Sequence, residues 1–86
     1  MDSRDDTLIE LFLDAAWAEK GLSANTLESY RYDLRRLAMD LRESGRDLAS
    51  AGREDLLRFL AVQVQSGRSP RSLSRYLSGF RQFYRW

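Results

Sequence analysis

The sequence predicts an all-α protein, a compact four-helix bundle in a single small domain. Apolar residues recur at intervals of three and four along four separate segments, and no segment alternates apolar and polar residues over the length of a strand. Glycines or a Ser-Pro pair separate these segments, so the connections between helices are short. With 86 residues, of which 43% are hydrophobic, the chain is long enough to bury one core.

The first two predicted helices carry much of the expected core. The first spans about residues 7–20, with Asp5 near its positively polarised N-terminal end. The second is the longest, at about residues 24–43. Either Ser23 or Asn25 can cap it, because a short polar side chain accepts hydrogen bonds from the first N–H groups of a helix. Their inward apolar residues are Leu8, Ile9, Phe12, Leu13, Ala16 and Trp17 on the first helix, and Leu27, Tyr30, Leu34, Leu37, Ala38 and Leu41 on the second.

The third and fourth predicted helices follow a connector at residues 45–52. The third spans about residues 53–65 and ends near Gly67. The fourth begins at Ser69-Pro70, an N-cap followed by proline at the first helical position, where the missing N–H costs nothing. Their apolar residues are Leu56, Leu57, Phe59, Leu60 and Val64 on the third helix, and Leu73, Tyr76, Leu77, Phe80, Phe83 and Tyr84 on the fourth.

The chain contains no cysteine and no histidine, which excludes several kinds of chemistry. There can be no disulfide framework, thiolate metal site or cysteine nucleophile. The commonest general base and metal ligand is missing, and with it any serine–histidine triad. The carboxylates near helix starts are explained by the positive end of the helix dipole. We therefore expect no catalytic residue, no metal and no cofactor.

The apolar runs are only a few residues long, so none of them can span a membrane. The first six residues are mostly acidic, which is the reverse of a signal peptide. We expect a cytoplasmic protein with no membrane partner.

Arginine is concentrated in the second half of the chain. Residues 1–43 carry ten acidic and six basic side chains, whereas residues 44–86 carry three acidic and eight basic ones. The last 21 residues hold five arginines and no acidic side chain. An arginine-rich segment of this kind is typical of a nucleic-acid surface, because the planar guanidinium group suits phosphate and guanine. An arginine-rich helix can also be an ordinary solvated face, and the composition leaves both interpretations open.

Spacing favours the nucleic-acid surface. On the fourth helix Arg71, Arg75, Ser78, Gln82 and Arg85 follow one another at intervals of three or four, on the side away from Leu73, Leu77 and Phe80. Packing that apolar stripe is expected to turn Arg71 and Arg75 outward, with Arg68 and Ser69 at the helix start. The second helix offers Ser23, Asn25, Thr26 and Arg31 near its own start. Plain capping explains Ser23 or Asn25 equally well, and Arg36 can form surface pairs with Asp33 and Asp40.

Two motifs resemble those of a known family. The run Ser23-x-Asn25-Thr26-x-x-x-Tyr30-x-x-Asp33-Leu34 resembles the N-terminal segment of Xer-type tyrosine recombinases and phage integrases. The run Ser72-x-x-Arg75-x-Leu77-Ser78-x-x-Arg81-x-Phe83-Tyr84 resembles the last N-terminal helix of the same family, and adds Ser72 and Arg81 to the candidate DNA-binding residues. Gly79 departs from the alanine often found there, which weakens the helix slightly.

The resemblance implies a SAM-like, core-binding domain that forms half of a clamp round the recombination-site duplex. Its second and fourth helices would face the DNA. The catalytic half, with its nucleophilic tyrosine, would lie C-terminal, so residues 1–86 would be one domain truncated before the catalytic domain. None of the four tyrosines here is then the nucleophile, and the chain by itself would be an inactive monomer. Its partners would be double-stranded DNA and, in the full-length parent, other recombinase protomers.

A helical protein-interaction domain is the alternative hypothesis. Its arginine face would meet an acidic partner, and the apolar stripe that runs on to Trp86 would dock another helix. This hypothesis explains the arginine excess. It does not explain why short polar residues gather at the starts of the second and fourth helices.

Overall fold

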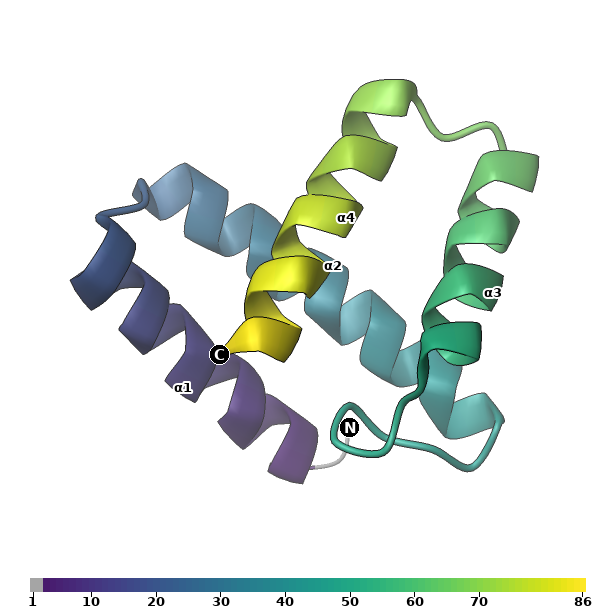
Figure 1. Cartoon of the computed structure of the whole chain (residues 1–86), viewed down its shortest axis with the longest axis horizontal. Coiled ribbons are helices and arrows are strands. Elements are labelled where there is room, and N and C mark those ends of the chain that lie inside the picture. Colours follow the sequence, from purple (N-terminus) through teal and green to yellow (C-terminus); the bar gives the residue numbers. More distant parts are fainter. Residues whose placement is uncertain (1–2) are drawn as a thin grey trace.

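The computed structural model describes residues 3–86, and these residues form four helices and no strand. In chain order the helices are α1 (Ser3–Lys20), α2 (Ala24–Glu43), α3 (Arg53–Gln65) and α4 (Pro70–Arg85) (Figure 1). The predicted all-α four-helix fold is confirmed, and the predicted bounds of the second and third helices agree with the structure.

α2 is in contact with every other helix. α1 and α4 pack most extensively against it, and α3 contacts both α2 and α4. In Figure 1, α4 lies in front of α2, between α1 and α3. α1 and α4 also meet, because the rings of Phe12 and Phe83 lie edge to face with their centroids 5.4 Å apart.

The helix ends form as the local sequence predicts. Ser23 caps α2 and Ser69 caps α4, each accepting a hydrogen bond at 3.2 Å from the backbone N–H three residues later. Pro70 takes the first helical position of α4. The first three helices are each followed by a glycine with positive φ, a conformation that side chains disfavour: Gly21, Gly45 and Gly67.

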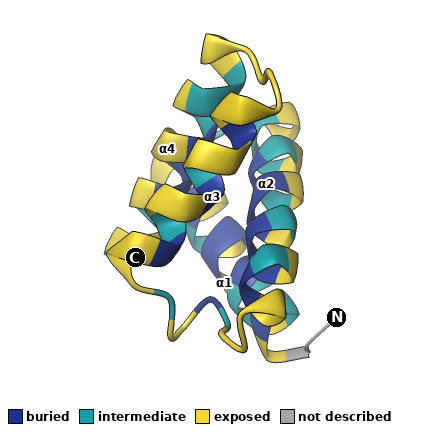
Figure 2. Cartoon of the chain, turned by 90° about the vertical axis from the view of Figure 1, so that its right-hand side faces the viewer, coloured by how far each residue is buried: buried dark blue, intermediate teal, exposed yellow. Residues whose placement is uncertain are grey.

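The core lies on the inner sides of the four helices, shown in dark blue in Figure 2. An aromatic cluster joins α3 to α4, with the Phe59 ring 5.7 Å from Tyr76 and 5.8 Å from Phe80. The buried apolar residues are Ile9, Phe12, Leu13, Ala16, Tyr30, Leu34, Leu37, Ala38, Leu41, Leu48, Phe59, Tyr76, Phe80 and Phe83. Core positions predicted for Tyr30, Tyr76, Phe80 and Phe83 are therefore confirmed.

Several expectations about the helices are wrong, and Leu57, Leu77 and Tyr84 are exposed although the sequence placed them on apolar stripes. α1 begins at Ser3, earlier than about residue 7. Trp17 is 59% exposed, because Ala16 takes the inward position at the end of α1 and the next residue turns away from α2. Val64 is also exposed, because Gln63 takes the inward position of α3, where it accepts a hydrogen bond from Arg36.

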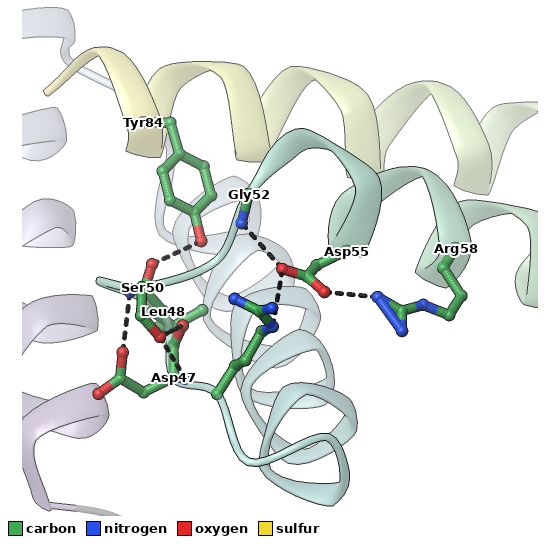
Figure 3. A network of polar contacts seen from close by, with 8 residues as sticks. Asp47, Leu48, Ser50, Gly52, Asp55, Arg58 and Tyr84 are labelled. Atoms are coloured by element: carbon green, nitrogen blue, oxygen red, sulfur yellow. Dashed lines mark hydrogen bonds and ion pairs between the residues drawn. The ribbon is translucent and has the colours of Figure 1, made fainter.

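The connector between α2 and α3 is bonded to the start of α1 and to the end of α4 through the backbone of one residue, Leu48. Leu48 is fully buried, and its N–H donates to Asp5 Oδ1 at 3.1 Å. Its carbonyl accepts from the Tyr84 hydroxyl at 2.9 Å, a bond drawn in Figure 3. Burial, reinforced by nearby carboxylates, raises the pKa of Tyr84, so its hydroxyl stays protonated and keeps donating. The connector thereby fixes the end of α4 relative to the start of α1.

Candidate nucleic-acid interface

The structure divides the arginines into two groups. Five of those whose surroundings are described form ion pairs with carboxylates: Arg31, Arg35, Arg46, Arg58 and Arg75. The second group consists of cations that form no ion pair with any of residues 3–86: Lys20, Arg68 just before α4, and Arg71, Arg81 and Arg85 on α4. The second group can meet an external anion without first breaking an internal contact.

Arg75 belongs to the first group, contrary to the expectation that it points outward. Its Nε donates to Asp33 Oδ2 at 2.8 Å and its Nη2 donates to Asp33 Oδ1 at 2.9 Å. Asp33 is only 1% exposed, so the two-point contact compensates a buried charge. The hydrogen bonds to Asp33 raise the pKa of the guanidinium group. The side chain lies beside the inward-facing Tyr76 and is long enough to reach back to α2.

Arg31 is also engaged within the chain. Its Nε and Nη2 donate to the two carboxylate oxygens of Glu10 at 2.7 and 2.9 Å, and its Nη1 contacts Glu28. The hydrogen bond from Arg31 lowers the pKa of Glu10, and the same bond raises the pKa of Arg31. This contact ties α1 to α2.

The surface pairs expected for Arg36 are not formed. It donates to Tyr76 Oη at 3.4 Å and to Gln63 Oε1 at 3.3 Å, and its guanidinium group lies 5.8 Å from the Tyr32 ring centroid. Asp33 is taken by Arg75, which leaves Arg36 to link α2 with α3 and α4.

The short polar residues at the starts of α2 and α4 also fall into two groups, those with hydrogen bonds inside the chain and those without. Ser23 also donates its hydroxyl hydrogen to Thr26 Oγ1 at 3.0 Å, and Ser69 donates to Ser72 Oγ at 3.2 Å, so capping accounts for the positions of both serines. Asn25 is exposed and forms no side-chain hydrogen bond with the described residues. Capping by Ser23 leaves the Asn25 amide available to an external partner.

The unpaired cations border a groove between α4 and the turn that joins α1 to α2. The groove encloses about 560 Å³ and contains three cations but no carboxylate. Its lining consists of Lys20, Leu22, Ser74, Leu77, Ser78, Arg81, Gln82 and Arg85. Because Leu22 lies next to Ser23, the groove leads directly to the exposed start of α2.

The structure thus brings together only part of the predicted set. Ser78 and Arg81 line the basic groove, whereas Arg31 and Arg75 are held by carboxylates. Lys20 and Ser74 were missed by the sequence analysis, and Gln82 and Arg85 were noticed only as part of a row. The missing signal was the alternation of intervals of three and four, which places Arg71, Ser74, Ser78, Arg81 and Arg85 along one face of α4.

One hydrogen-bond network lies at the edge of this groove. Ser78 Oγ is 3.1 Å from Tyr30 Oη, and Gln82 Nε2 donates to both oxygens at 3.2 Å. Gly79 permits this contact between α2 and α4, because a Cβ atom at that position would lie 3.0 Å from Tyr30 Cδ1. Glycine at this position lowers the helix propensity of α4, as expected, and it also allows α2 and α4 to pack closely.

The described residues include no group of three or more acidic side chains that could hold a metal ion. No helix in this part of the chain is long and apolar enough to cross a membrane. What the site offers is a groove with cations, hydroxyl groups and an amide, which suits binding of an anion.

Comparison with known proteins identifies the type of domain. The family model described as the phage integrase N-terminal SAM-like domain matches residues 9–86. Proteins named tyrosine recombinase XerD are similar along the whole chain, with 48% identity in Pseudomonas putida, 44% in Pseudomonas aeruginosa and 42% in Yersinia pestis. The chain covers 29% of the length of each of these relatives. No solved structure matches it significantly.

Proposed function

The chain belongs to the phage integrase N-terminal SAM-like domain family, and from this premise we propose that it is the DNA-binding, core-binding domain of a tyrosine recombinase. The observation that carries the proposal is the face of α4 on which Arg71, Arg81 and Arg85 have no carboxylate partner among residues 3–86. Unpaired arginines on one helix face supply the charge that phosphate binding requires. The duplex would lie across this face and the start of α2.

The proposed contact surface modifies the set expected from the sequence. It keeps Ser23, Asn25, Thr26, Arg68, Ser69, Arg71, Ser72, Ser78 and Arg81, and it adds Lys20, Ser74, Gln82 and Arg85. Arg31 and Arg75 act in it as positioning residues, because their ion pairs hold α2 against α1 and α4.

The proposal assigns catalysis to residues outside this chain. The relatives are tyrosine recombinases more than three times as long as this chain. We propose that the chain is one domain of such a protein. It would act together with other protomers, in the cytoplasm, where bacterial DNA lies. Alone, it would be monomeric and would neither cleave nor rejoin DNA.

A titration at several salt concentrations tests the proposal. A fluorescent duplex of arbitrary sequence is mixed with the 86-residue chain, and anisotropy gives the dissociation constant at each concentration. We expect affinity to fall linearly on a log–log plot as salt increases, because each phosphate contact releases counterions. Arg81→Ala should weaken binding, whereas Arg42→Ala, which removes the same charge from the far end of α2, should leave it nearly unchanged. Equal effects of the two substitutions would contradict this placement of the interface.

A second candidate function is protein interaction, favoured by an apolar groove between α3 and α4. This groove encloses about 440 Å³ and is lined by Arg53, Leu56, Leu57, Leu60, Leu77, Phe80, Arg81, Tyr84 and Arg85. Binding there would depend on apolar contact, so Leu57→Ser would abolish it. The same substitution would leave DNA binding unchanged, which separates the two candidates.

A further inference from the structure

Ser78 combines exposure with a fixed hydrogen-bond environment. The residue is exposed on α4, yet its hydroxyl oxygen is 3.1 Å from Tyr30 Oη and 3.2 Å from Gln82 Nε2. Tyr30 itself is only 6% exposed and belongs to the core. A surface hydroxyl is therefore hydrogen-bonded to a buried tyrosine.

The number of hydrogens on each group decides which group donates and which accepts in this network. The Gln82 amide nitrogen has two hydrogens, and it donates one to Tyr30 Oη and one to Ser78 Oγ. Tyr30 has one hydroxyl hydrogen, and Ser78 Oγ is its one acceptor among residues 3–86. Leaving that hydrogen without an acceptor would be costly in a buried position. Tyr30 therefore donates to Ser78, whose oxygen accepts twice.

The hydroxyl hydrogen of Ser78 then has no acceptor within the described chain. The contacts with Tyr30 and Gln82 reach this oxygen from the same side, so the hydrogen is left for the other side, and Ser78 lines the groove. Ser78 consequently offers a donor, and no acceptor, to whatever enters the groove.

The orientation of the Gln82 amide supports this arrangement. In the observed orientation one buried acceptor, Oε1, has no hydrogen-bond partner. The reversed amide would replace this one acceptor with two buried N–H donors, which need two partners in place of one. The observed orientation therefore asks for fewer additional hydrogen bonds.

From this network we propose that Ser78 is an oriented hydrogen-bond donor to a DNA phosphate, with Tyr30 and Gln82 as the positioning residues that turn its hydroxyl outward. The inference rests on the proposed DNA-binding function. A phosphate oxygen is favoured over a base edge because the serine side chain is short and lies among arginines, where the anionic backbone would be drawn closest. The hydroxyl would thus help to fix the register of the domain on the duplex without reading its sequence.

The first test is Ser78→Ala, measured as duplex affinity of the 86-residue chain at low salt for two duplexes of unrelated sequence. We expect a roughly three- to tenfold loss of affinity, equal for both duplexes, because one hydrogen bond to a charged acceptor is removed. Ser44→Ala is the control: Ser44 is exposed just past the far end of α2, its side chain forms no hydrogen bond with the described residues, and its loss should reduce affinity less than twofold. A loss confined to one duplex would mean that Ser78 reads a base, and would overturn the assignment to phosphate.

The second test asks whether Tyr30 orients Ser78. Tyr30→Phe keeps the ring beside Gly79 and removes the hydroxyl, and its folding is checked by circular dichroism before binding is measured. We expect Ser78→Ala to cost less in the Tyr30→Phe background than in the parent chain, because the serine is already free to rotate. Equal losses in the two backgrounds would overturn the positioning role.

The outcomes separate this inference from the proposed function. If the parent chain binds DNA and Arg81→Ala weakens it, while Ser78→Ala binds as well as the parent, the inference alone is wrong. If the parent chain does not bind duplex DNA even at low salt, both are wrong.

Discussion

Arg75 of α4 closes on Asp33 of α2 through two hydrogen bonds, Nε to Oδ2 at 2.8 Å and Nη2 to Oδ1 at 2.9 Å. The pair joins the two helices that carry the proposed DNA-binding surface. Its carboxylate is 1% exposed and its arginine side chain is 38% exposed, so the charge of Asp33 is buried while that of Arg75 is partly solvated. The distance between α2 and α4 therefore depends on this ion pair.

Removing either partner should destabilise the fold, and by unequal amounts. Arg75→Met leaves a buried carboxylate without compensation and should lower the free energy of unfolding by about 2–3 kcal/mol, at the low end for buried pairs because solvent screens the arginine. Asp33→Asn leaves only a partly solvated cation, and should cost about 1–2 kcal/mol. Urea titration of both variants measures the difference. Arg71→Met, on the exposed side of α4, should stay within about 0.5 kcal/mol of the parent.

The two groups of arginines should differ in the salt dependence of DNA binding. Arg71→Ala, Arg81→Ala and Arg85→Ala should each reduce the slope of log affinity against log salt by about one, because each removes a phosphate contact. Arg31→Gln should leave the slope unchanged, since its guanidinium group is held by Glu10. Anisotropy titrations at four or more salt concentrations give the slopes. A fall of one unit for Arg31→Gln would show that this ion pair opens on DNA.

Gly79→Ala should destabilise the chain although alanine is the better helix former. The added Cβ would lie 3.0 Å from Tyr30 Cδ1, and the ring cannot easily move because its hydroxyl is bonded to Ser78 and Gln82. We expect a net loss of about 1 kcal/mol, the cost of overpacking exceeding the gain in helix propensity. In the Tyr30→Phe background the ring can shift, so the substitution should become neutral or stabilising. Thermal and urea unfolding of the four chains check both results.

Acid should unfold the chain partly through Asp55 at the start of α3. The hydrogen bond from the Gly52 N–H at 2.9 Å is the main cause that holds the pKa of Asp55 below its usual range, with Arg58 and Arg46 adding to it (Figure 3). A carboxyl group whose pKa is lowered by folding stabilises the fold above its unfolded value of about 4, and this contribution is lost as the pH falls through the folded pKa.

Urea unfolding at pH values from 7 down to 2 tests this contribution. Asp55→Asn should lower the stability near neutral pH and show a smaller further loss on acidification, because it has no proton to take up. The neighbouring Glu54→Gln serves as the control, since Glu54 is exposed and its side chain forms no hydrogen bond with any of residues 3–86. If the free energy of unfolding falls as steeply with acidification in Asp55→Asn as in the parent, other carboxylates cause the acid sensitivity.

Local features of the fold could be predicted because their causes are local. The caps by Ser23 and Ser69, the proline at the start of α4 and the glycines that end the first three helices depend on residues within one turn. The buried faces of α2 and α4 follow from the helical period. The exposure of Trp17 could not be predicted from the helical period, because it depends on which side of α1 packs against α2.

The sequence by itself determined that the chain is helical, where α2, α3 and α4 begin, and that arginine gathers toward its C-terminal half. Only the tertiary structure decided which arginines are available to an external anion, since this depends on carboxylates far away in the sequence. Asp33 lies 42 positions before Arg75, and Glu10 lies 21 positions before Arg31. Spacing along a helix gives the direction in which a side chain leaves the backbone. The packing of α1 and α4 against α2 determines whether an opposite charge lies within reach of its end.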